Sequence, residues 1–302
     1  MKHLFLWLLI LFFLDNTLHS QNLDSIKFRK AESLYNQSKV DSALTLYLEL
    51  SAEVEKGNIN PYTQIAMGNV SHIYYSNRSK KAYPWLKKII NSPLNDSLDT
   101  NSLIDPMTNF KHKASLRLFS IEESFSEDSL ALSYLNDAFD KYPYYGFPGS
   151  CTNVYKHDAY ISRLKYQFLL RLDEEYEAIE FGLSSILSAG ADGAGFRYHI
   201  AAVLEYLKTK HSSKIIQSEW NKSLDQLEVT PENNYKLQYL GYEILIKPRK
   251  TYFANAVERC LKYYNLPKKE MQEYLKSHPF SKSIFDIKKF LKEIKKEKKY
   301  QD

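Results

Sequence analysis

Residues 28–47 read FRKAESLYNQSKVDSALTLY and predict two successive helices separated by a short polar break. Before the break, Ala31, Leu34 and Tyr35 recur at helical spacing. After it, Ala43 and Tyr47 do the same, and Ala43 follows Ala31 by 12 residues. The second helix thus carries a small residue and, four positions later on the same face, an aromatic residue.

The same outline returns three times along the chain, with Leu86, Leu135 and Gly182 four residues after the alanine, where the first copy has Tyr47. The second-helix alanines of the four copies lie 39, 49 and 47 residues apart, at Ala43, Ala82, Ala131 and Ala178. The positions around them are Val70, Ile73, Leu86 and Ile89 in the second copy, Phe119, Leu135, Ala138 and Pro143 in the third, and Tyr166, Leu169, Glu175 and Gly182 in the fourth. Self-similarity at such a period indicates a repeat of one helical unit.

This repeat resembles the tetratricopeptide (TPR) family over about residues 24–190. In that family, small residues let two antiparallel helices approach, and large residues fill the groove against the neighbouring unit. The family period is about 34 residues, and Val70, Phe119 and Tyr166 stand where the family has a small residue. An irregular stack of helical hairpins without TPR ancestry is the alternative.

We expect an all-α fold of stacked antiparallel helical hairpins, a TPR-like α-solenoid, with a C-terminal capping helix. No convincing alternating strand is visible, and Asp24, Asp41 and Asp128 are placed to cap helices. The expected organisation is a signal peptide at 1–20, TPR-like repeats at 21–190 and a continuing helical region at 191–302. The helices expected in that last region cover 196–209, 212–227, 231–246, 251–264, 268–276 and 281–299.

The first residues have the layout of a secretory signal peptide. Lys2 precedes the apolar run Leu4–Leu14, and a polar stretch leads to an acceptable cleavage site after Ser20. The run is shorter than the roughly 20 residues that span a bilayer, although an uncleaved anchor is the alternative. Export to a periplasm or out of the cell would permit a disulfide between Cys151 and Cys260, and two separate thiols are equally open.

The net charge of +5 is concentrated near the C-terminus. Residues 282–299 hold eight lysines against Asp286, Glu293 and Glu297, so the rest of the chain is nearly neutral. A nucleic-acid-binding face should be basic over a broad area, and this chain is not. The basic amphipathic helix predicted at 281–299 suggests weak contact with an anionic membrane surface, or a cap with solvated lysines. The membrane-facing lysines would be Lys288, Lys289, Lys292, Lys295 and Lys296.

The aromatic stretch 142–149 is the best candidate for a contact surface, because Tyr and Phe offer large and fairly rigid contact area. Its alternative is that the rings fold back onto the helices. The candidate partner-binding residues are Tyr142, Tyr144, Tyr145, Phe147 and Tyr155. No zinc-ligand spacing or nucleotide loop is present, and no cofactor is expected.

We therefore expect a scaffold that binds a protein or peptide and has no catalysis of its own. One alternative is an exported α-helical enzyme acting on glycan or peptide, with Asp173, Glu174 and Glu175 in its site. Another is a membrane-surface protein held by its basic C-terminal helix.

Overall fold

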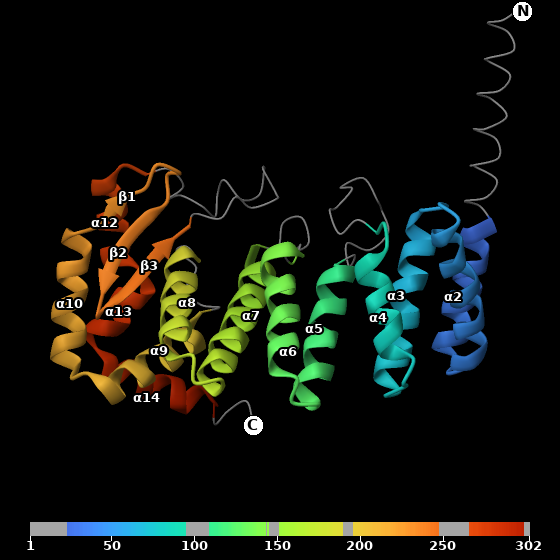
Figure 1. Cartoon of the computed structure of the whole chain (residues 1–302), viewed down its shortest axis with the longest axis horizontal. Coiled ribbons are helices and arrows are strands. Elements are labelled where there is room, and N and C mark those ends of the chain that lie inside the picture. The colour runs from blue at the N-terminus through green and yellow to red at the C-terminus, as the bar shows by residue number, and fades with distance from the viewer. Residues whose placement is uncertain are drawn as a thin grey trace, which may run out of the picture. The chain divides into compact units, whose positions relative to one another are not determined.

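The computed structural model describes residues 23–94, 109–142, 144, 151–189, 196–247 and 266–298, with the backbone alone at 151–155 and 298. These residues form two compact units (Figure 1), the first ending at Pro143 and the second beginning at Tyr144. The all-α fold class is confirmed, with one small sheet added in the second unit. The boundary between the units falls inside the 21–190 range that the sequence suggests as one array.

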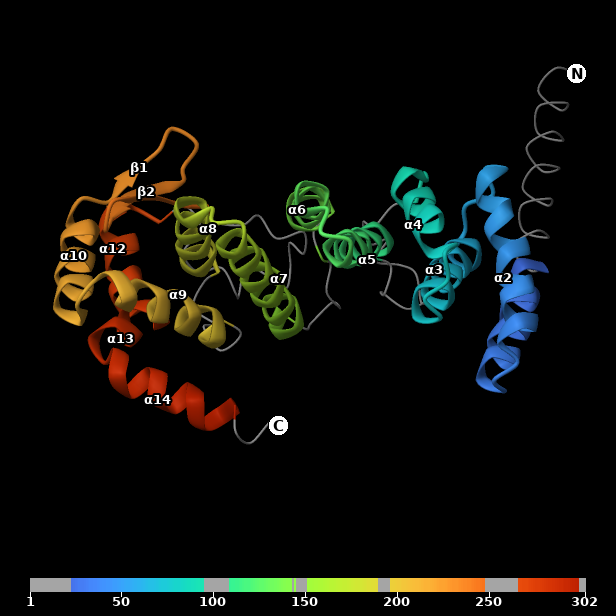
Figure 2. The same ribbon diagram turned by 60° about the horizontal axis from the view of Figure 1, so that its bottom comes forward.

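The first unit is a succession of helices that pack in sequence order. They are the helix of residues 23–36, α2 (Val40–Glu55), α3 (Pro61–Ser76), α4 (Ala82–Asn91), α5 (Phe110–Ser124), α6 (Asp128–Asn136) and the π-helical turn η1 (Asp137–Lys141). Each helix from α2 to α5 packs on the next, and α3 also contacts α5. Figure 2 shows α3 and α5 in one layer and α4 and α6 in the other.

Four hairpins share the same turn between their two helices. A residue with positive φ ends the first helix in each, namely Ser38 (60°), Arg78 (50°), Ser126 (60°) and Asp173 (60°). The amide of the next residue then donates to a carbonyl five positions earlier, as Lys39 does to Leu34 at 2.9 Å and Glu174 to Leu169 at 3.0 Å. This left-handed termination satisfies carbonyls that the helix end leaves open. Each of the four periodic alanines follows within five residues and is buried. The alanine period therefore marks a repeated helical hairpin.

The predicted caps at Asp41 and Asp128 are wrong. α2 begins after Lys39 and α6 after Glu127, neither with a side-chain cap, and both aspartates lie inside the first turn. The preceding left-handed turn already fixes where each helix starts. Asp24, the third predicted cap, lies within the helix of residues 23–36.

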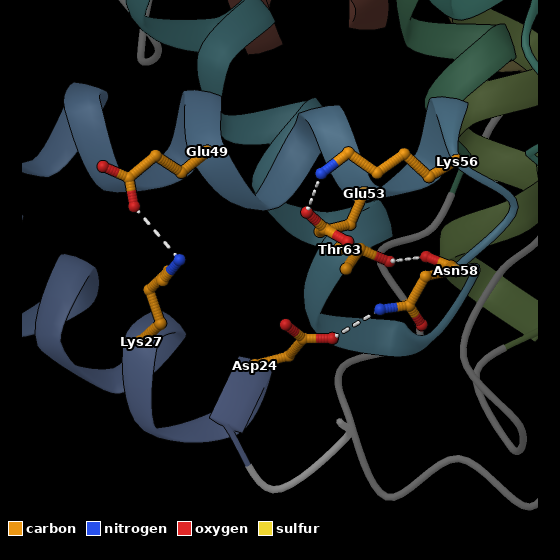
Figure 3. Close-up of polar contacts among 7 residues, drawn as sticks. All are labelled: Asp24, Lys27, Glu49, Glu53, Lys56, Asn58 and Thr63. Carbon is orange, nitrogen blue, oxygen red and sulfur yellow. Dashed lines mark hydrogen bonds and ion pairs between the residues drawn. The ribbon is translucent and has the colours of Figure 1, made fainter. Parts of the chain in front are cut away.

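The carboxylate of Asp24 ties the first helix to the turn between α2 and α3 (Figure 3). It accepts a hydrogen bond from Asn58 at 3.0 Å, which Figure 3 shows. It accepts a second from Asn60 at 2.8 Å. Asn60 is itself the N-cap of α3, in a reciprocal capping box with Thr63. Because Asp24 is buried, these bonds to neighbouring amides replace its lost hydration.

The second unit opens with the fourth hairpin and continues into a different arrangement. Its elements are α7 (Cys151–Arg171), α8 (Glu175–Ser188), α9 (Arg197–Lys210), α10 (Ser213–Asp225), the strands β1 (Glu228–Val229), β2 (Tyr235–Tyr239) and β3 (Tyr242–Ile246), and then α12 (Lys268–Ser277), α13 (Pro279–Phe285) and α14 (Ile287–Lys298). The strands form one antiparallel sheet in the order β1-β2-β3. α8 packs on β3 and α10 on β2.

The helix predicted at 231–246 is wrong, because this segment forms the β2–β3 hairpin. Tyr239 and Tyr242 pair across a two-residue turn. Leu240 and Gly241 have φ of 53° and 90°. A tight hairpin turn with positive φ at both central positions matches the twist of the strands, and glycine adopts it without strain.

Side chains of α8 satisfy the outer edge of β3. The amides of Glu243, Leu245 and Lys247 donate to Tyr176 Oη, Ser184 Oγ and Ser188 Oγ at 3.3, 3.2 and 3.0 Å. An uncovered strand edge is a template for pairing with another chain. Here α8 occupies that edge, so β3 is not open to strand addition.

Two further helices were predicted at 281–299 and 251–264. The segment 281–299 is not one helix, since the backbone of Asp286 (φ −136°, ψ 58°) is not helical and separates α13 from α14. His278 Nδ1 caps the start of α13 by accepting from the Phe280 amide at 3.1 Å. The helix predicted at 251–264 and Cys260 lie outside the described residues.

Candidate functional site

The aromatic residues predicted as a contact surface are only partly described. Tyr142 is half-buried after η1, and its carbonyl oxygen lies 2.7 Å from Nδ1 of buried His112. Tyr144 is also half-buried and stacks on His157 with 4.0 Å between ring centroids. The ring of Tyr144 thus packs within its own unit, whereas the contact of Tyr142 to His112 is made by its backbone.

The remaining candidates cannot be placed as side chains. Tyr145 and Phe147 lie outside the described residues, and Tyr155 is described only as backbone in α7. The aromatic surface as a whole therefore stays a prediction.

The acidic run of the enzyme alternative lies at the start of α8. Asp173 occupies the left-handed turn and Glu174 is the N-cap position. Glu175 pairs with Lys210 at 3.1 Å. Hydrogen bonds from Tyr206 and Lys210 hold the pKa of Glu175 below its usual value. A general acid needs a raised pKa, so Glu175 is set for charge pairing and helix initiation instead.

A different cluster stands out on the layer of α3 and α5. These helices approach closely at Gly68, where a β-carbon would meet Cε1 of Phe110 at 2.5 Å. Gly68 and the half-buried Arg117 guanidinium thus belong to one interface between the two helices.

Arg117 is held there by neutral groups. Its Nη1 donates to Ser71 Oγ at 2.9 Å, and its Nη2 lies 3.1 Å from His72 Nδ1. The guanidinium carbon stands 5.3 Å from the centre of the Tyr75 ring. Ser71 Oγ in turn donates to the Gly68 carbonyl at 2.8 Å, which leaves its lone pair to accept from Arg117. The arginine is thereby fixed in orientation.

The electrostatics of this cluster favour an anion. Among the described residues, no carboxylate forms an ion pair with Arg117. Lys113 lies four residues earlier on α5 and adds positive charge. Burial, followed by the charges of Arg117 and Lys113, lowers the pKa of His72, so its Nδ1 is a neutral acceptor for Arg117. Burial also lowers the pKa of Arg117, which still keeps its charge because its pKa starts above 12.

We call this cluster the α3–α5 site. Its members are Ser71, His72, Tyr75, Lys113 and Arg117. The sequence analysis missed it because its members come from helices about 40 residues apart. The available signal was the basic pair Lys113 and Arg117, whose spacing of four places both on one helix face. Nothing in the sequence alone reveals that this face meets α3.

Neither a metal centre nor a membrane span is found in the described part of the chain. No group of three or more His, Cys, Asp and Glu side chains gathers there. No described helix is both long and apolar enough to cross a bilayer.

Comparisons of the chain with protein-family models, with curated proteins and with solved structures find no match.

Gly68→Ala is expected to destabilise the first unit by about 1–2 kcal/mol. The added methyl group would overlap the Phe110 ring, which outweighs the gain of up to about 1 kcal/mol for Gly→Ala in a helix. Urea unfolding followed by circular dichroism measures this. Phe110→Leu in the same chain should recover part of the loss, because it removes the nearest ring atoms. A stabilised Gly68→Ala variant would contradict the close approach of α3 and α5.

Proposed function

We propose that this protein is an exported helical-repeat scaffold that binds a protein or peptide partner and has no catalysis of its own. The α3–α5 site would hold an acidic side chain or a chain-terminal carboxylate of that partner. The aromatic stretch 142–149 would supply a further contact surface for the partner.

The observation that carries the proposal is a pre-oriented arginine, Arg117, that has no acidic partner among the described residues. A guanidinium has five N–H donors, and the contacts to Ser71 and His72 use two of them. The remaining donors suit a carboxylate, which Arg binds in a planar, bidentate geometry. Because Ser71 and Tyr75 already restrain the side chain, a ligand would lose little rotamer entropy on binding.

The repeated hairpin supports the same proposal. Stacked hairpins present their first helices side by side. α3 and α5 are the first helices of two neighbouring hairpins, and they contact each other. In helical-repeat proteins such surfaces bind extended partners, so the inference from architecture to function is one of analogy. TPR membership and export from the cytosol are parts of this proposal.

Arg117→Gln is expected to weaken binding of acidic peptides at least about tenfold, equivalent to about 1.4 kcal/mol. The loss follows from removing a half-buried charge that would meet the ligand carboxylate. Binding of the purified chain to an immobilised library of random peptides measures it, read as the enrichment of Asp and Glu in bound peptides.

The matched control is Arg171→Gln on α7 of the second unit. It removes the same charge from an arginine that also stands over an aromatic ring, 4.4 Å from the centre of Phe168. Arg117→Lys keeps the charge but loses the bidentate geometry, and it should bind at an intermediate level. An unaltered preference for acidic peptides in folded Arg117→Gln protein would refute the site.

A further inference from the structure

We infer that the second unit carries a separate surface, on α14 and the end of α9, that docks electrostatically onto an anionic membrane without inserting into it. This surface is called the lysine face. It consists of Lys208, Lys288, Lys292, Lys295 and Lys296, which together with Leu291 line a shallow depression. Lys289 lies beside it on the same helix, three residues before Lys292.

The apolar side of α14 is not available to enter a bilayer. Ile287, Leu291 and Ile294 are all buried, and α14 packs against α9 and α13. An amphipathic helix that inserts must expose its apolar side to the lipid. α14 therefore exposes mainly charged side chains to solvent. Any attraction of α14 to a membrane must be electrostatic.

The charges of α14 are segregated around the helix. Glu293 and Glu297 both pair with Arg197, at 3.7 and 2.8 Å, and this arginine also stands 6.0 Å from the centre of the Phe290 ring. The two acids are thereby drawn to the flank of the helix that faces the start of α9. The opposite flank keeps the lysines.

The lysine face is almost unneutralised. Among the described residues, its one ion pair joins Lys295 to Glu205 at 3.7 Å, with 73% of the lysine side chain exposed. Lys208 extends the positive surface from the last turn of α9. Several exposed ammonium groups thus share one side of the unit.

The kind of charge fits a lipid surface better than a protein ligand. A lysine ammonium is a compact, strongly hydrated charge on a flexible stem, whereas arginine suits planar ligands of fixed geometry. Headgroups of anionic lipids are mobile and spread over an area, so several flexible cations can each find one. A cluster of four to eight basic residues on an amphipathic helix is the composition that anionic leaflets attract.

The test is partition of the full chain onto sedimented vesicles of phosphatidylglycerol and phosphatidylcholine, compared with vesicles of phosphatidylcholine alone. The ratio of the two partition coefficients is the measured quantity, so that any contribution of the apolar Leu4–Leu14 segment cancels. We expect a ratio well above one in low salt that falls toward one at about 0.5 M salt, because screening shortens the reach of exposed charges.

The decisive variant replaces Lys288, Lys292, Lys295 and Lys296 together by Gln. It should lower the ratio at least about tenfold, since each lysine near an anionic surface contributes roughly fivefold. The matched control replaces four exposed lysines of α10 and α12, Lys214, Lys222, Lys269 and Lys276, and should keep most of the ratio.

Several outcomes would overturn the inference. Equal losses in the two quadruple variants would show that only net charge matters. Binding that persists in high salt would point to insertion. Binding to double-stranded DNA or to an acidic polypeptide, with none to anionic vesicles, would assign the lysine face to another class of partner.

Discussion

Replacing Trp220 by alanine is expected to lower the free energy of unfolding of the second unit by about 3–5 kcal/mol, the range for truncating a large buried aromatic residue. Trp220 on α10 is fully buried. Its ring meets Tyr239 of β2 and Phe280 of α13 edge to face, each with 5.2 Å between centroids. Side chains of β2 and α13 thus converge on one side chain of α10.

The indole also makes a polar contact that a smaller residue would lose. Its Nε1 donates to Ser281 Oγ at 2.9 Å, and Ser281 donates onward to the Leu275 carbonyl. Trp220→Ala would therefore open a cavity and leave α10, β2 and α13 without their common contact. Deletion of this contact should loosen the sheet from the C-terminal helices.

Urea unfolding followed by circular dichroism measures the loss, and hydrogen exchange of the second unit locates it. Trp220→Phe is the matched variant, because it refills most of the space but cannot donate to Ser281. Its free energy of unfolding should lie between those of Trp220→Ala and the wild type. A loss below about 1 kcal/mol for Trp220→Ala would contradict this account of the core.

Acidification is expected to destabilise the second unit through His199. Burial, followed by the charge of Arg163, lowers the pKa of this histidine to about 3. Its Nε2 lies 3.1 Å from Ser185 Oγ, which itself donates to the Gly182 carbonyl. That arrangement is consistent with a proton on Nε2, while buried Nδ1 has no hydrogen-bond partner in the part of the chain that the structure describes. A second proton on Nδ1 would add an unpaired buried charge.

The sign of the effect follows from proton binding. An unfolded histidine titrates near pH 6.5, so between that pH and about 3 the unfolded state binds a proton that the folded state does not. The contribution of His199 to the free energy of unfolding is complete above pH 6.5 and decreases as the pH falls below it. The loss from His199 should be about 2 kcal/mol between pH 7 and 5, and about 5 kcal/mol over the whole window.

The measurement is urea unfolding at several pH values in a chain carrying Trp7→Phe and Trp85→Phe, so that only Trp220 fluoresces and reports on the second unit. His199→Gln is the comparison, because Gln can still donate to Ser185 but does not titrate. Its stability should fall less steeply below pH 6.5. Parallel curves for the two proteins would mean that His199 is not the group responsible.

The helical repeat could be predicted because its signal is local. A buried alanine such as Ala43 or Ala131 must recur on the same helix face, and the left-handed turn before it is a property of neighbouring residues. The β2–β3 hairpin was missed because residues four apart, such as Tyr235 and Tyr239, share a face in a helix as well as in a strand. Buried Leu237, between them, and Gly241 at the turn are the residues that distinguish the strand.

The α3–α5 site, in contrast to the repeat, depends on contacts between residues distant in the sequence and could not be predicted. Aromatic composition favoured the 142–149 stretch, yet Tyr144 stacks within its own unit. Arg117 attracted no prediction, because a single basic residue on a helix is usually solvated. Only its tertiary contacts to Ser71, His72 and Tyr75 identify Arg117 as part of a candidate site.

The helical class, the spacing of the hairpins and the concentration of positive charge near the C-terminus can all be read from the amino-acid sequence. These features depend on spacing along one helix or on composition, and both can be read from neighbouring residues. Only the tertiary structure decided that Gly68 lets α5 approach α3, that Glu293 and Glu297 turn toward Arg197, and that the lysines remain exposed. Those outcomes depend on which helix faces meet, and that is settled by the packing of side chains distant in the sequence.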